Sequence, residues 1–145
     1  MSATDFLPWM PSLLTLLGWF LVNHQNNTRE QRKEMRAAAD QCKNLAREGV
    51  ELGMKYWVGD EATHAWQVKA ALDELEVEIC RFPDHKGRIK LLEHHADLLD
   101  AITGSDFESA TRKVRPATDP LMRNVAKVRQ RILHEIENQF QTHYN

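Results

Sequence analysis

An apolar run near the N-terminus, residues 6–22, limits the possible folds of this chain more than any other feature. Its sequence is FLPWMPSLLTLLGWFLV, and it contains no Lys, Arg, Asp or Glu. As a helix it would rise about 26 Å, close to the roughly 30 Å of a bilayer's hydrocarbon core. Trp9 and Trp19 lie near its two ends, as aromatic residues do at membrane interfaces. The run therefore predicts a single-pass transmembrane helix.

Two prolines leave other interpretations of this run open. Pro8 and Pro11 fit the first turn of a helix better than its interior. A helix that begins at Pro11 has only about 18 Å of apolar length, which is typical of an interfacial or buried segment. A cleaved signal peptide is disfavoured, because residues 1–5 contain no base. The expected anchor residues are Phe6, Leu7, Trp9, Leu13, Leu14, Leu16, Leu17, Trp19, Phe20, Leu21 and Val22.

Charge is distributed unevenly along the chain. Apart from Asp5, every Lys, Arg, Asp and Glu lies in residues 29–145, where 19 bases meet all but one of the 21 acids. This near neutrality argues against a nucleic-acid binder that acts through bulk charge. Four bases directly follow the apolar run, and by the positive-inside rule they place the remainder in the cytoplasm of a bacterium. These bases are Arg29, Arg32, Lys33 and Arg36.

The predicted organisation is therefore a membrane anchor in residues 1–28 and a cytoplasmic helical bundle in residues 29–145, at the bacterial inner membrane. Two cysteines without CxxC spacing fit a reducing compartment. Apolar residues recur at helical spacing and no strand pattern is present, so we expect an all-α, antiparallel bundle of about four helices. The expected helices cover residues 12–56, 61–81, 85–102, a short stretch at 105–113, and 120 to near the C-terminus.

Local signals set the ends of these helices. Gly59 suits the position after a helix, and Asp60 the N-cap of the next. Gly104 should end the third long helix, and Ser105 with Glu108 matches a capping box. Asp119 and Pro120 suit the first positions of the last helix. Within the first helix, the small residues Ala39, Ala46, Gly49 and Gly53 indicate either the close approach of a partner helix or a kinked turn.

Few residues suggest chemistry. His94 and Asp97 are the only good metal-ligand pair at helical spacing, and they lack the usual zinc motifs. Neither Cys42 nor Cys80 has a base at helical spacing, and no GxSxG or phosphate-binding loop occurs. We therefore expect a protein that is not an enzyme and that has no catalytic residues, no metal site and no cofactor.

A basic stretch in the last third of the chain has an acidic counterpart in the second helix. The acids are Asp73, Glu74, Glu76 and Glu78. The bases contact an anionic partner, such as lipid or nucleic acid, or face the acids within the bundle, or are simply solvated. The candidate contacts for an anionic partner are Arg112, Lys113, Arg115, Arg123, Lys127, Arg129 and Arg131.

The short anchor, basic flank, long first helix and the turn TGSDFE at 103–108 together resemble uncharacterised small bacterial single-pass membrane proteins with a cytoplasmic helical domain. Some of these occur in mobile elements, and no functional residues carry over from them. We expect a membrane-anchored interaction module that binds a protein partner or forms a homo-oligomer. The alternatives are a membrane-perturbing effector, such as a small toxin or phage-exclusion factor, and a binder of nucleic acid or anionic lipid.

Overall fold

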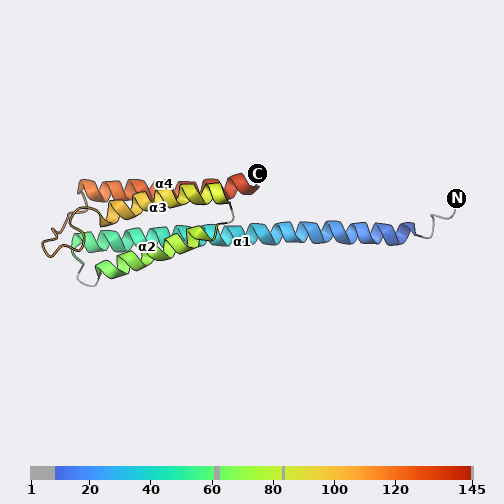
Figure 1. Cartoon of the computed structure of the whole chain (residues 1–145), viewed down its shortest axis with the longest axis horizontal. Coiled ribbons are helices and arrows are strands. Elements are labelled where there is room, and N and C mark those ends of the chain that lie inside the picture. Colours follow the sequence, from blue (N-terminus) through green and yellow to red (C-terminus); the bar gives the residue numbers. More distant parts are fainter. Residues whose placement is uncertain (1–8, 61–62, 83, 145) are drawn as a thin grey trace. The chain divides into compact units, whose positions relative to one another are not determined.

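The computed structural model describes residues 9–60, 63–82 and 84–144, and over these residues the protein is all-α. The chain divides into two compact units, residues 1–34 and residues 35–145. In the second unit, helices that follow one another along the chain lie antiparallel (Figure 1). The predicted all-α helical bundle is thus confirmed. The helices are α1 (Met10–Val58), α2 (Ala65–Cys80), α3 (His85–Thr103) and α4 (Pro120–Tyr144).

Both ends of α1 carry the expected signals. Pro11 lies in its first turn, where an N–H would have no partner within the helix. At the other end, Gly59 adopts a left-handed φ of 85°. The N–H of Gly59 donates to the carbonyl of Tyr56, and the N–H of Asp60 donates to that of Lys55. These two bonds form a Schellman motif, so the predicted long helix and its end at Gly59 are confirmed.

The predicted transmembrane helix is not supported. Over the residues that the structure describes, no helix combines the length and apolar character needed to cross a membrane. The reason is where α1 begins: from Met10 to Val22 the apolar residues rise only about 20 Å. After Val22 the same helix continues through the polar residues 23–28. Two of the predicted anchor residues, Phe6 and Leu7, lie outside the described residues.

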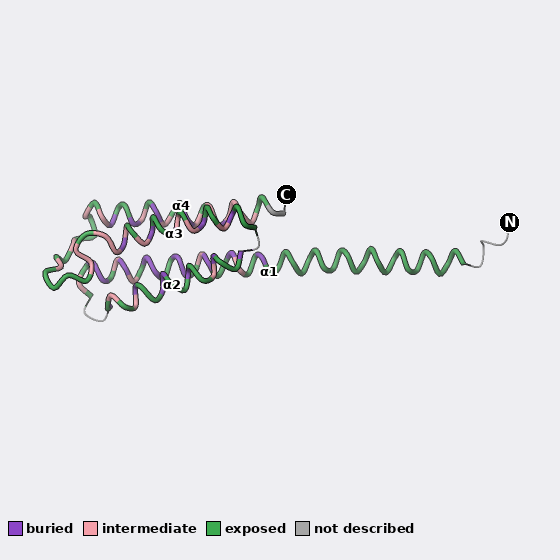
Figure 2. Tube along the Cα trace, viewed as in Figure 1, coloured by how far each residue is buried: buried purple, intermediate pink, exposed green. Residues whose placement is uncertain are grey.

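Glycines of α1 bring two other helices close to its backbone. A Cβ atom added to Gly49 would lie 3.0 Å from Cδ2 of Leu72 on α2, and one on Gly53 would lie 2.7 Å from Cγ2 of Ile102 on α3. All four positions belong to the bundle's interior, where buried residues follow the inner side of each helix (Figure 2). Of the two interpretations of the small residues, close approach of partner helices is the one observed.

The buried face of α2 does not include its tryptophan. Val68, Leu72, Leu75 and Ile79 are each fully buried, whereas Trp66 is 65% exposed. The cause is the helical period, because Trp66 lies about 160° from Val68 around the axis and so on the side away from the buried residues. α2 begins at Ala65 behind the N-cap residue His64, so the predicted N-cap at Asp60 is wrong.

The connection between α3 and α4 is a loop, and the predicted short helix at 105–113 is wrong. Ser105 and Glu108 have left-handed φ values of 65° and 62°, which exclude a capping box and an α-helix. Asp106 organises the loop instead. Its carboxylate accepts from the backbone N–H of Lys113 and from the guanidinium of Arg115, both at 2.8 Å. The Lys113 and Arg115 bonds hold the pKa of Asp106 well below its usual range.

The ends of α3 and α4 follow simple capping. The Asp84 carboxylate accepts from the N–H of Gly87 at 2.5 Å and caps α3, which Gly104 ends at its C-cap. The Asp119 carboxylate accepts from the N–H of Leu121 at 2.8 Å, and α4 begins at Pro120. The predictions for Gly104, Asp119 and Pro120 are confirmed.

Glu137 joins α4 to α1 within the bundle. Its carboxylate accepts from the ammonium of Lys43 and, at 3.0 Å, from the guanidinium of Arg36, both on α1. Arg36 also lies 4.9 Å from the centre of the Phe140 ring. The hydrogen bonds from Lys43 and then Arg36 lower the pKa of Glu137 to about 2.

This low pKa predicts a pH-dependent contribution to stability. The Glu137 carboxylate stabilises the fold fully above the unfolded pKa of 4.5, and the contribution disappears as the pH falls towards about 2. In urea unfolding, Glu137→Gln should be less stable than wild type at about pH 7, with a smaller difference at about pH 3. The exposed Glu93→Gln is the control. An equal difference at both pH values would contradict the assignment.

Candidate functional site

The apolar segment, defined as residues 9–22, is the most unusual surface of the protein. Its large apolar side chains are all more than half exposed, from 56% for Met10 to 71% for Phe20. Neighbouring residues on a helix point about 100° apart, so the exposed run from Trp19 to Val22 covers every direction around the axis. Figure 2 shows no buried position along this part of α1. The predicted anchor residues it contains are Trp9, Leu13, Leu14, Leu16, Leu17, Trp19, Phe20, Leu21 and Val22.

Two threonine hydroxyls, one in this segment and one after it, are satisfied within the helix. The Thr15 hydroxyl donates to the carbonyl of Pro11 at 2.8 Å. The Thr28 hydroxyl donates to the carbonyl of His24 at 3.0 Å. A threonine bonded in this way can enter an apolar medium without leaving an unpaired donor.

The four bases that follow the segment have different roles. Lys33 pairs with Glu30 at 2.9 Å, with both side chains largely exposed. Arg36 belongs to the bundle, because it contacts Asp40 at 3.3 Å besides Glu137. Arg32 and Arg29 are exposed about one and two turns before Arg36. Of the predicted basic flank, Arg29, Arg32 and Lys33 thus lie in the first unit and Arg36 in the second.

Two bases of the basic stretch hold the loop between α3 and α4. The Arg112 guanidinium lies 3.9 Å from the centre of the Tyr56 ring and donates to the Tyr56 carbonyl. Arg115 stacks 5.0 Å from the centre of the Trp57 ring, and its backbone N–H donates to the Trp57 carbonyl at 2.8 Å. Arg115 also reaches Asp119 at 3.6 Å. These contacts give Arg112 and Arg115 a structural role.

The other five bases are separated by the fold. Arg123, Lys127 and Arg131 are exposed on α4 at intervals of four residues, so they share one face of that helix. Lys113 is exposed in the loop, and Arg129 is half-buried on a different side of α4. The sequence predicted one continuous basic stretch. In the structure, Arg123, Lys127 and Arg131 form an exposed row on one face of α4.

The acids of α2 do not pair with these bases. Asp73, Glu74 and Glu76 are exposed. Glu78 forms an ion pair with Arg81, the C-cap residue of α2. Among the described residues, no ion pair joins α2 to α4. The alternative in which the acidic and basic helices face each other is thus not what the fold shows.

The histidine, aspartate and cysteine side chains considered for metal binding or catalysis differ in burial. His95 is buried and its Nε2 lies 2.9 Å from the carbonyl of Leu72. Asp97 is exposed, while His94 is half-buried, and the described residues contain no group of three or more possible metal ligands. Cys42 is buried, and burial raises the pKa of its thiol to about 12, so it is a poor nucleophile.

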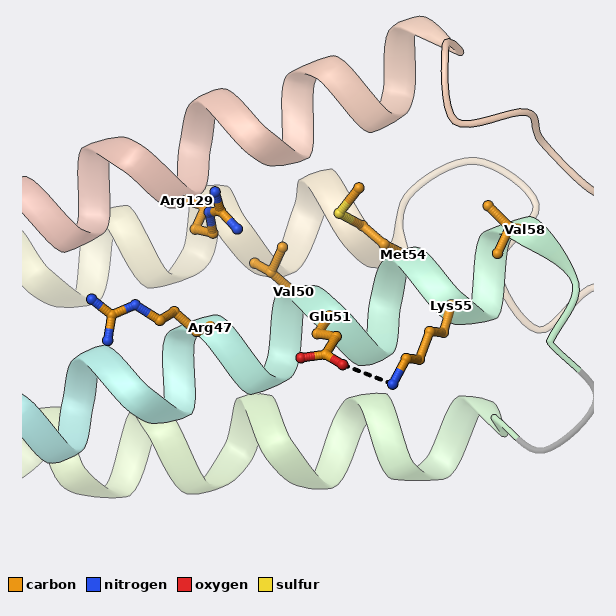
Figure 3. A pocket seen from close by; sticks show the side chains of 7 residues that line it. All are labelled: Arg47, Val50, Glu51, Met54, Lys55, Val58 and Arg129. Carbon is orange, nitrogen blue, oxygen red and sulfur yellow. Dashed lines mark ion pairs between the residues drawn. The ribbon is translucent and has the colours of Figure 1, made fainter.

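A groove on the bundle surface is a second candidate site, and it was not predicted. It has a volume of about 470 Å³ between α1 and α4 (Figure 3). Arg129 contributes from α4, and all other lining residues come from α1. The α1 residues that line the groove recur three and four positions apart in the sequence, but this spacing alone does not indicate a binding site. The lining residues are Arg47, Val50, Glu51, Met54, Lys55, Val58 and Arg129.

In comparisons with known proteins, the chain matches no family model, no curated protein and no solved structure.

Proposed function

We propose that the protein is a non-enzymatic helical interaction module attached to the cytoplasmic face of a bacterial inner membrane. In this proposal the apolar segment inserts into lipid. The bundle, residues 35–145, then binds a protein partner or a second copy of the chain. The observation that carries the proposal is the apolar segment's exposure on every side of its helix.

The distribution of apolar residues favours lipid over a partner helix for this segment. A helix that pairs with one other helix has an apolar stripe and a polar opposite face, whereas one that is apolar all round is surrounded by apolar material. Trp19, Phe20, Leu21 and Val22 are each at least 57% exposed and lie on different sides of the axis. Lipid tails supply apolar contacts in every direction at once.

The bases after the segment favour the cytoplasmic leaflet. Arg29, Arg32 and Lys33 follow the apolar residues within three turns of the same helix. The cytoplasmic leaflet carries anionic lipids, and each base near it contributes about 1 kcal/mol of attraction. A helix that inserts its apolar end there brings these bases to the headgroup layer.

Binding to vesicles tests the proposal. The full chain should float with vesicles that contain phosphatidylglycerol and phosphatidylcholine. Leu13→Glu/Leu17→Glu should reduce the partition coefficient at least about 100-fold, because two buried leucines contribute about 3 kcal/mol or more. The matched control is Val77→Glu/Ile89→Glu, which replaces two exposed apolar residues of the bundle. Wild-type protein that stays in the aqueous fraction would refute the proposal, as would equal losses in both variants.

A further inference from the structure

The groove between α1 and α4 combines an apolar floor with cationic residues. Val50 is buried and Met54 half-buried at its base, and Val58 is partly exposed at one end. Arg47 and Lys55 of α1 and Arg129 of α4 supply positive charge (Figure 3). This pairing of apolar and cationic groups matches a molecule that has an apolar tail and an anionic head.

The groove is lined by three basic side chains and one acidic side chain, and the acid pairs with only one of the bases. Glu51 contacts Lys55 at 2.7 Å, and the two side chains neutralise each other. Arg47 donates to the neutral amide oxygen of Asn44 at 3.2 Å. The groove therefore has a net positive charge that comes from Arg47 and Arg129.

Arg129 has a donor that the protein does not satisfy. Its Nε atom is buried and has no hydrogen-bond partner among the described residues. A buried N–H of a charged group without an acceptor destabilises a folded protein. A carboxylate or phosphate oxygen in the groove would give the Arg129 guanidinium, which lines it, an anionic partner in a charge-assisted hydrogen bond.

The groove's volume fits a small molecule. About 470 Å³ lies within the roughly 300–1,000 Å³ of ligand sites for small molecules. We infer that this groove binds an anionic amphiphile, with its phosphate or carboxylate on Arg129 and its chain over Val50 and Met54. Fatty acids and anionic phospholipids share this chemistry. This site is separate from the apolar segment, so either one can fail without the other.

Methionine methyl resonances provide a test on the full chain that separates the two sites. Met54 lies in the groove, Met10 lies in the apolar segment, and Met122 is buried in the core. With methyl-labelled methionine, decyl phosphate below its critical micelle concentration should shift the Met54 resonance saturably. Decanol and inorganic phosphate, which each carry one half of the chemistry, should bind Met54 at least about tenfold more weakly.

Two variants on the same helix test the role of Arg129. Arg129→Gln should weaken binding of decyl phosphate at Met54 at least about tenfold, because it removes the charge and the Nε donor. The exposed Arg131→Gln is the matched control and should bind as wild type does. If Arg129→Gln does not fold, the comparison of decyl phosphate with decanol on the wild-type protein decides the proposal alone.

Several results would overturn the proposal. These are a Met54 resonance that decyl phosphate leaves unchanged, equal binding of decanol, and equal losses in both arginine variants. A Met54 resonance that moves on dilution without any amphiphile would show that a second copy of the chain fills the groove instead. Two further titrations identify the source: decanoate represents free fatty acids, and dihexanoyl phosphatidylglycerol represents phospholipids. Saturable binding of either supports the proposal.

Discussion

Replacing Trp57 with Ala is expected to destabilise the bundle by about 3–5 kcal/mol. The Trp57 side chain is completely buried at the end of the bundle, where α1 meets the loop after α3. Its indole N–H donates to the carbonyl of Ile102 at 2.8 Å, and its ring lies 6.0 Å from that of Phe107. The variant loses this packing, leaves a cavity and leaves a buried carbonyl without its donor.

Urea unfolding of the full chain, followed by circular dichroism, measures the effect. The matched control is Trp66→Ala, because Trp66 is 65% exposed and its removal should change the free energy of unfolding by less than about 1 kcal/mol. Similar losses at both tryptophans would show that Trp57 is not the centre of this end of the bundle.

Gly53→Ala is expected to destabilise the protein, although alanine is the better helix former. Alanine at an exposed helical position would gain about 1 kcal/mol over glycine. At Gly53 the new Cβ would lie 2.7 Å from Cγ2 of Ile102, which is fully buried on α3. Overpacking of this kind costs about 1–3 kcal/mol before the helix gain is subtracted. We expect a net loss of up to about 2 kcal/mol in the free energy of unfolding.

One turn earlier, Gly49 provides the comparison. Its added Cβ would meet Cδ2 of Leu72 at 3.0 Å, and this methyl at the end of a leucine side chain moves more easily than the Ile102 Cγ2 methyl, which is bonded directly to Cβ. Gly49→Ala should therefore cost less than Gly53→Ala. Ile102→Ala should partly rescue Gly53→Ala, because it removes the clashing methyl. Additive losses in the double variant would exclude a direct clash as the cause.

Most of the fold was predictable because local signals agreed with the helical periodicity. The hydrogen bonds at the helix ends marked by Gly59 and Asp119 join residues that are close in sequence. The loop after α3 was not predictable, since Ser105 and Glu108 match a capping box by residue type alone. Their left-handed backbone follows from the contacts of Asp106 with Lys113 and Arg115, seven and nine residues away.

The candidate sites were predictable only in part. Exposure of the apolar segment followed from its composition, but its helical length depended on where α1 begins, at Met10. The basic stretch looked continuous because sequence distance does not show that Arg115 turns back onto Trp57. The groove requires Arg129 of α4 to lie beside residues of α1 that are about 80 positions earlier, which no local pattern reveals.

The two cysteines of the chain differ in a way that makes the protein easy to label. Cys42 is sealed in the core with a thiol pKa of about 12, whereas Cys80 is exposed at the end of α2. A maleimide dye should therefore attach to Cys80 alone while the bundle is folded, since the thiolate is the reactive form. Reaction at Cys42 then reports opening of the bundle. The native sequence thus carries both a single attachment point for a fluorophore and an internal sensor of unfolding.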